Sequence, residues 1–174
     1  MKKLLQDYKA GKVSLSTVLQ KLKTLPYEDL EFAKIDTHRE IRKGFPETIF
    51  CQGKTIIQIT QIVKKLSKDQ NILLTKANKN VYTSVKKLYP AARYNEAAKT
   101  ILIQRYKPKR KKGTILVLTA GTSDIPVAEE AVVTAELMGN KVEKVYDVGV
   151  AGVHRLFDSK EKIFHASVII VIAG

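Results

Sequence analysis

The spacing of apolar residues changes from strand-like to helix-like and back again through the last third of the chain. Short apolar runs at 115–118 and 168–172, and a looser run at 142–148, have the length and the Val/Ile/Leu content of β-strands. After the first run, apolar side chains recur at helical spacing from Val127 to Met138, and Gly139-Asn140 ends that helix. This alternation predicts a doubly wound parallel α/β sheet, in which the strand at 168–172 is buried on both faces.

The preceding residues predict a smaller arrangement of helices and strands. Helices are predicted at about 1–10, 15–25, 56–68 and 80–88, and short strands at about 32–35, 49–51, 72–75 and 100–104. The stretch at 107–113, KPKRKKG, combines a proline, a glycine and a run of cations, which is typical of a linker. We therefore predict a basic α/β domain over 1–112 and a second domain over 113–174.

The charge of the chain divides at the same point. Residues 1–112 carry a net charge of +17 and residues 113–174 carry −3, within a total of +14. A basic domain is compatible with nucleic-acid binding. However, the lysines lie at solvent-facing helical spacing, only Tyr82, Tyr89 and Tyr94 offer aromatic rings near them, and no recognition motif stands out. Solvated helix faces are therefore the favoured interpretation, and a nucleic-acid-binding module is the alternative.

The turn after the strand at 115–118 is the clearest candidate for chemistry. Gly121 is expected to let the backbone bend toward a ligand, and Thr122 and Ser123 supply hydroxyl groups. The next helix has Pro126 in its first turn, and its free N–H groups favour an anion in the same space. Asp124 would repel a phosphate, so it either binds ribose hydroxyls or caps the helix. A capped loop without a ligand explains the pattern equally well.

Three segments of the chain resemble one protein family. AGTSDIPVAEEA at 120–131, DVGVAGVHRL at 147–156 and VIIVIAG at 168–174 are similar to the carboxylase domain of the nickel-pincer cofactor biosynthesis protein LarB. That domain is related to PurE, the aminoimidazole ribonucleotide (AIR) carboxylase. LarB also has an amino-terminal segment that PurE lacks. This chain resembles that segment at Asp36, His38, Arg39, Arg42, Gly44, Pro46, Glu47 and Gly53-Lys54-Thr55. The resemblance implies an incomplete flavodoxin-like, PurE-type parallel sheet preceded by the small basic α/β domain.

The resemblance also implies an activity. Members of the family carboxylate the pyridine ring of nicotinic acid adenine dinucleotide and release AMP, which leaves a dicarboxylated pyridinium mononucleotide. CO2 is the implied co-substrate, no tightly bound cofactor is implied, and Mg2+ is a candidate because related hydrolytic chemistry commonly uses it. An AIR carboxylase-like protein of purine biosynthesis and a non-catalytic nucleotide-binding module are the alternatives. A homo-oligomer is expected of the complete protein.

By the same resemblance, the turn at 121–124 holds the ribose-phosphate portion of the substrate, with Asp124 on the sugar hydroxyls. His154 and Arg155 match a His-Arg pair in which the arginine contacts phosphate, because a guanidinium fork meets two phosphate oxygens at once. The alternatives are a solvated helix residue for Arg155 and a structural histidine for His154. Arg39, Arg42 and Glu47 are expected either to contact a substrate carboxylate or phosphate or to form an internal ion-pair cluster.

Cys51 and the motif Gly53-Lys54-Thr55 invite catalytic interpretations that the sequence does not support. The only cysteine has no assured cationic neighbour, so Cys51 is expected to be a buried or half-buried residue in a reducing cytoplasm. A phosphate-binding P-loop requires glycine five positions before Gly53, where the chain has Thr48. The motif is therefore expected to begin a helix.

The catalytic residues of the family are expected outside this chain. The family attributes catalysis to a glutamate shortly after the glycine of the third strand and to a later cysteine, and both would follow Gly174. A flavodoxin-like sheet also needs a fourth strand beside 168–172 to cover its apolar edge. We therefore expect a fragment that is inactive alone, with a partner chain that supplies the strands as the alternative. The absence of a long apolar run or a signal-peptide pattern predicts a cytoplasmic protein without a membrane partner.

Overall fold

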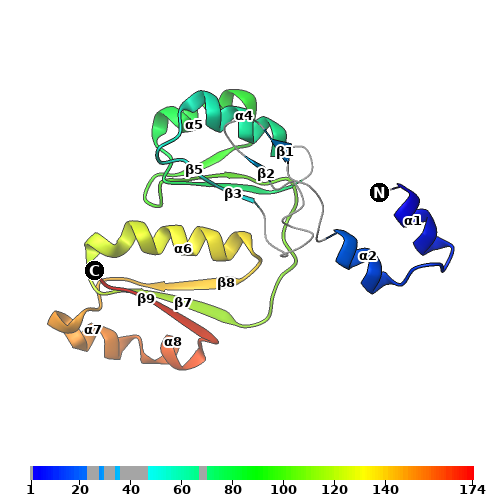
Figure 1. Cartoon of the computed structure of the whole chain (residues 1–174). Helices are drawn as coiled ribbons and strands as arrows, with labels where there is room; N and C mark the ends of the chain where they lie inside the picture. The colour runs from blue at the N-terminus through cyan, green and yellow to red at the C-terminus, as the bar shows by residue number, and fades with distance from the viewer. Residues whose placement is uncertain (1, 23–27, 30–33, 36–46, 67–69) are drawn as a thin grey trace. The chain divides into compact units, whose positions relative to one another are not determined.

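The computed structural model describes residues 2–22, 28–29, 34–35, 47–66 and 70–174 in two compact units, Met1–Glu47 and Thr48–Gly174. In the first unit, helices α1 (Lys2–Lys9) and α2 (Leu15–Leu22) agree with the predicted helices (Figure 1). Two-residue strands β1 (Glu28–Asp29) and β2 (Lys34–Ile35) form an antiparallel pair. Only the last two residues of the strand predicted at 32–35 are among the described residues.

A four-stranded sheet has the order β3-β4-β6-β5. Its strands are β3 (Glu47–Phe50), β4 (Ile72–Thr75), β5 (Arg93–Asn95) and β6 (Thr100–Ile103). Helices α4 (Ile56–Leu66) and α5 (Lys79–Leu88) lie together on one face of this sheet (Figure 1). Every residue of β4 is buried, although α4 and α5 lie on only one face of the sheet (Figure 1). The apolar stripe of α4 is buried at Ile59, Ile62, Val63 and Leu66.

The hairpin of β5 and β6 was only half predicted. The apolar run at 100–104 indicates β6, and the structure confirms a strand there. The sequence gives no strand signal for β5, because its three residues, Arg93, Tyr94 and Asn95, are polar or amphipathic. The strand exists because it pairs with β6, antiparallel, with Tyr94 opposite Ile101. A neighbouring strand has therefore decided the conformation of a segment whose own composition does not.

The second sheet is the predicted parallel one. Its strands are β7 (Thr114–Thr119), β8 (Lys141–Val145) and β9 (Val168–Ile172). The order is β8-β7-β9, so the first strand lies in the middle with the second and third on either side. This is how a flavodoxin-like order begins, and the predicted fold class is confirmed. Helix α6 (Ile125–Leu137) covers one face, and α7 (Val153–Asp158) and α8 (Lys160–His165) cover the other (Figure 1).

The side chains of β7 alternate between the two faces of this sheet. Val117 packs against Ala128 and Val132 of α6. Leu116 and Leu118 form the opposite cluster, which also receives side chains from β8, α7 and α8. Each such burial stabilises the fold by about 1.5–3 kcal/mol. The middle strand is consequently the element to which both helical layers are attached.

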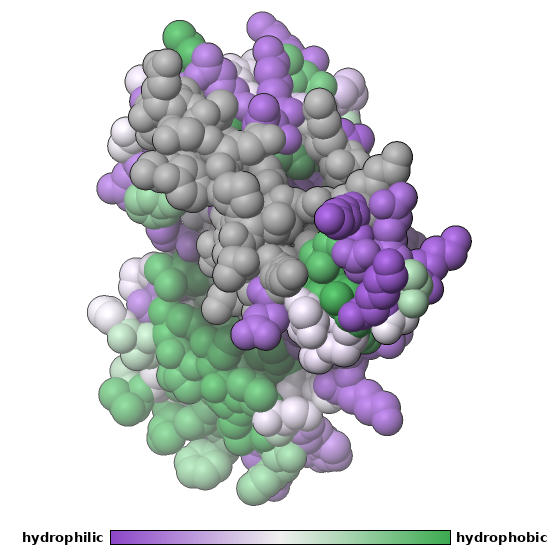
Figure 2. Space-filling view, turned by 45° about the vertical axis from the view of Figure 1, so that its right-hand side comes forward, coloured by the Kyte–Doolittle hydropathy of each residue, from purple (hydrophilic) through white to green (hydrophobic). Residues whose placement is uncertain are grey.

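One expectation about burial is confirmed and one is wrong. The uncovered apolar edge expected at 168–172 is present: β9 lies at the edge of the sheet, and Val168 and Val171 are 52% and 64% exposed, so the strand lacks the burial on both faces that its composition alone predicted. Figure 2 shows hydrophobic surface gathered over the part of the chain that holds this sheet. Val127 was placed on the apolar stripe of α6 but is 51% exposed, because the buried face of the helix runs through Ala128, Val132 and Ala135.

The predicted boundary between 112 and 113 lies in the segment that joins β6 to β7, within the second compact unit. The Lys111 N–H donates to the Gly139 carbonyl over 2.9 Å, which ties this segment to the end of α6. The division into domains 1–112 and 113–174 stays a prediction. No helix among the described residues is long and apolar enough to cross a membrane.

Candidate functional site

The two turns singled out in the sequence lie side by side at the carboxyl edge of the parallel sheet. The Val148 N–H donates to the Thr119 carbonyl over 3.0 Å, and the Gly149 N–H donates to the Ala120 carbonyl over 2.8 Å. On the other side, the Ala120 N–H donates to the Ile172 carbonyl over 3.0 Å, which brings in the end of β9. Ligands of open α/β sheets bind at this edge, beside the strand where the order reverses.

The structure requires glycine at position 149. At position 121 it does not show the backbone bend for which glycine was expected. A Cβ at position 149 would lie 2.7 Å from the Ala120 carbonyl oxygen, so the two loops can approach only because residue 149 has no side chain. Gly121 has φ −125° and ψ 173°, which is extended backbone, and a Cβ there would meet only ordinary contacts. The expectation that Gly121 allows a special bend is therefore wrong. The space that it leaves open faces Ser123 and Asp124.

Asp124 caps its own turn. Its side chain is buried, and its Oδ2 accepts a hydrogen bond from the Gly121 N–H over 2.9 Å. This contact closes a short 3-10 turn, η1 (Thr122–Asp124), which runs directly into α6. The alternative in which the Asp124 side chain caps the following helix is not found, because Asp124 precedes α6 without a side-chain hydrogen bond to it. A contact with ribose hydroxyls stays a prediction. The turn holds Thr122 and Ser123 exposed.

An ion pair that the sequence did not reveal lies beside this turn. Asp147 follows β8 in a left-handed conformation with φ 60°, and its N–H donates to the Thr119 Oγ1 over 2.9 Å. Its Oδ2 pairs with the Arg155 Nη1. The Arg155 guanidinium also lies against Gly152, at the end of the 3-10 turn η2 (Val150–Gly152), where a Cβ would collide with it. The only sequence signal for this arrangement is that aspartate tolerates positive φ better than most residues.

The other predicted site residues are less closely connected. His154 is exposed on α7, so it is not a histidine buried in the core of the fold. Its contact with a ligand stays a prediction. Glu47 is the half-buried first residue of β3. Arg39 and Arg42 lie outside the described residues, together with Asp36, His38, Gly44 and Pro46. Neither alternative for the cluster of Arg39, Arg42 and Glu47 is decided.

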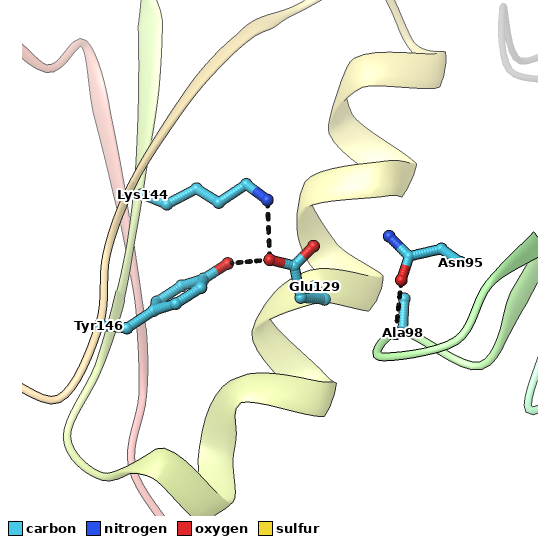
Figure 3. A network of polar contacts seen from close by, with 5 residues as sticks. All are labelled: Asn95, Ala98, Glu129, Lys144 and Tyr146. Carbon is cyan, nitrogen blue, oxygen red and sulfur yellow. Dashed lines mark hydrogen bonds and ion pairs between the residues drawn. The ribbon is translucent and has the colours of Figure 1, made fainter.

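A polar network holds the end of β8 against α6. The Lys144 Nζ and the Tyr146 hydroxyl both donate to the Glu129 Oε1, over 2.7 and 2.8 Å (Figure 3). Partial burial opposes ionisation of Glu129, but the hydrogen bonds from Lys144 and Tyr146 prevail and lower the pKa of its carboxyl. Burial and the adjacent carboxylate raise the pKa of Tyr146. Since Tyr146 immediately precedes Asp147, the network also fixes the start of the loop that carries the ion pair.

Comparison with known proteins identifies the family. Residues 27–105 match the LarB/PurE-like N-terminal domain. An alignment of 188 positions also relates the chain to an uncharacterized protein of Methanocaldococcus jannaschii, with 38% identity. The alignment covers 100% of this chain and 72% of that protein. The chain belongs to the LarB-related family. The LarB-type match contains the four-stranded sheet, and the parallel sheet of this LarB-related chain follows it.

Cys51 of this LarB-related chain is suited to packing rather than to catalysis. The side chain is 4% exposed, and burial raises the pKa of the thiol to about 11 despite the nearby Lys54. Gly53-Lys54-Thr55 begins α4, as predicted: the Gln58 N–H donates to the Thr55 Oγ1, and the Thr55 N–H donates to the Gln58 Oε1. Among the described residues, no group of three or more His, Cys, Asp or Glu side chains is placed to hold a metal ion.

Proposed function

We propose that this LarB-related chain binds nicotinic acid adenine dinucleotide at the carboxyl edge of the sheet β8-β7-β9. The binding would serve the family reaction, in which CO2 carboxylates the pyridine ring and hydrolysis releases AMP, to form pyridinium-3,5-biscarboxylic acid mononucleotide. The observation that carries the proposal is the junction of the two loops at Gly149 and Ala120. It sets the exposed hydroxyl turn beside the loop that leads into α7, the helix that carries Arg155.

Each side of the junction supplies a different chemistry. Thr122 and Ser123 offer hydroxyl donors at the beginning of α6, whose dipole favours an anion by roughly 0.3–1 kcal/mol. Arg155 offers a guanidinium that is about 43% exposed and already oriented by Asp147. A phosphate oxygen can therefore accept from the guanidinium without a large loss of side-chain entropy. Asp124 holds the turn in shape and acts on the substrate through that turn.

Calorimetric titration of the chain with the dinucleotide tests the proposal. Arg155→Ala should weaken binding about ten- to a hundredfold, because a charge-assisted hydrogen bond contributes about 1.5–3 kcal/mol. Lys141→Ala is the matched control, since Lys141 is an exposed cation at the start of β8, at the opposite edge of the sheet. Equal affinity of Arg155→Ala and the parent chain would contradict the proposal. Tighter binding of aminoimidazole ribonucleotide than of the dinucleotide would favour the purine alternative.

A further inference from the structure

A cavity of about 650 Å3 lies within the region that matches the LarB-type N-terminal domain. It is formed where three loops meet. The Cys51 N–H donates to the Thr75 carbonyl over 2.9 Å, which joins the ends of β3 and β4. The Ala77 N–H donates to the Lys99 carbonyl over 2.8 Å, which adds the turn of the β5–β6 hairpin. The volume lies within the range of small-molecule sites, which is about 300–1,000 Å3.

The lining of this cavity is cationic. Lys54, Lys76, Lys79 and Lys99 line it, and Glu96 is the acidic residue among its lining residues. Two of the amines already have partners: the Lys76 Nζ pairs with the Glu130 Oε2 at 2.9 Å, and the Lys54 Nζ donates to the Phe50 carbonyl over 2.8 Å. An excess of positive charge around a concave space attracts anions. The charge of the cavity therefore selects a negatively charged ligand.

Two of the lysines are held in an uncommon backbone conformation. Lys76 and Lys99 have φ values of 51° and 49°, in the left-handed region that residues other than glycine rarely adopt. Such positions cost free energy, and they cluster where a backbone is shaped to hold a ligand. Here the hydrogen bond between Ala77 and Lys99 fixes both loops together. The strain therefore falls on the two segments that close the cavity.

An aromatic wall accompanies the cations. Tyr94 lines the cavity, and its ring is stacked on Tyr82 with centroids 5.1 Å apart. The Tyr94 hydroxyl donates to the Ala77 carbonyl over 3.3 Å, which holds the ring beside the lysine loops. A fixed aromatic ring is a stacking platform for a flat ligand ring. The beginnings of α4 and α5 border the same space, and their dipoles add to its preference for anions.

We propose that this cavity binds a phosphorylated small molecule of mononucleotide size. Its phosphate would lie among Lys79, Lys99 and the beginning of α5, and its flat ring would lie toward Tyr94. The site is separate from the carboxyl edge of the parallel sheet and does not depend on the function proposed there. The cationic cavity gives the basic region of this chain a role that solvated lysine faces do not provide.

Titration of the 174-residue chain with AMP and with inorganic phosphate, followed by amide NMR, tests this site. AMP should shift the resonances of Ala77 and Asn78, and Lys79→Gln should weaken AMP binding about tenfold. Lys99→Gly provides a second variant, because glycine removes the amine and tolerates the left-handed backbone. Lys87→Gln, an exposed lysine of the same helix, is the charge-matched control and should change affinity less than about twofold.

Three results would overturn the inference. One is the absence of AMP binding at millimolar concentration, and another is an equal loss of affinity in the Lys87→Gln control. Equal affinities for phosphate and AMP would remove the role of the aromatic wall. Arg155→Ala should leave these AMP-induced shifts unchanged, which separates failure of this site from failure of the carboxyl-edge site.

Discussion

Asp147 and Arg155 form an ion pair that joins the loop after β8 to the first turns of α7. The pair explains how an exposed arginine on a six-residue helix can be held in one orientation at the carboxyl edge. The left-handed backbone of Asp147 turns the chain immediately after the strand, and its carboxylate contacts the guanidinium. The geometry of the candidate site is thus set by a backbone conformation as much as by the identity of its side chains.

Substitution of Asp147 should reveal that conformation. Asp147→Val should lower the free energy of unfolding by about 1–2 kcal/mol, because a β-branched side chain is strained at positive φ. Asp147→Asn should have little effect on stability, since asparagine tolerates this region. Chemical denaturation of both variants is the measurement. Equal stabilities of the two variants would show that the loop does not have the described conformation.

Removal of the Asp124 carboxylate should destabilise the turn. Asp124→Ala leaves the Gly121 N–H without its acceptor, and loss of such a cap typically costs about 1 kcal/mol. Binding of nicotinic acid adenine dinucleotide should weaken as well, because the hydroxyl turn loses its shape. Asp158→Ala, at the exposed end of α7, is the control. Unchanged stability and unchanged affinity in Asp124→Ala would contradict the assigned role.

The Glu129 network should make stability depend on pH in the acid range. The pKa of Glu129 is lowered by folding, so the network contributes fully above the ordinary carboxyl pKa of about 4.3 and is lost as pH falls through the lowered value. Glu129→Gln should therefore cost about 1 kcal/mol near pH 6 and less near pH 3. Glu136→Gln, exposed on the same helix, is the control. If Glu129→Gln lowers the free energy of unfolding by the same amount at pH 6 and at pH 3, the interpretation is refuted.

Cys51 should react slowly with thiol reagents in the folded chain. With a pKa of about 11 in place of 9.0, its thiolate fraction at neutral pH is roughly a hundredfold smaller than that of an unperturbed cysteine. The rate should rise about tenfold per pH unit until the pH approaches that value. Chain unfolded in urea is the reference. Equal rates in the folded and unfolded chain at pH 8 would contradict the described burial.

The sequence predicted well those elements whose own composition decides their structure. The apolar run of β7 and the helical spacing of α6 define a buried strand and its covering helix without reference to other segments. The alternation of such elements also led to the correct parallel sheet, whereas its flavodoxin-like order was implied by the family resemblance. By contrast, β5 is a strand because it pairs with β6, and the composition of Arg93, Tyr94 and Asn95 does not predict a strand.

The sequence predicted the two turns that lie side by side at the carboxyl edge, but it did not predict the contacts between them. Strand-to-helix turns mark the carboxyl edge, because parallel strands place such turns at one end of the sheet. The pairing of Asp147 with Arg155, the close approach at Gly149 and the left-handed lysines of the cationic cavity all involve contacts between segments. One sequence does not record such contacts. Hydroxyl and cationic residues could be named in advance, but their partners could not.

A crystal structure of the chain with nicotinic acid mononucleotide would show whether the carboxyl edge of β8-β7-β9 holds the nucleotide. Density for the sugar and phosphate is expected beside Thr122 and Ser123, with the phosphate in contact with the Arg155 guanidinium. Nucleotide bound elsewhere, with the carboxyl edge of β8-β7-β9 empty, would contradict this expectation.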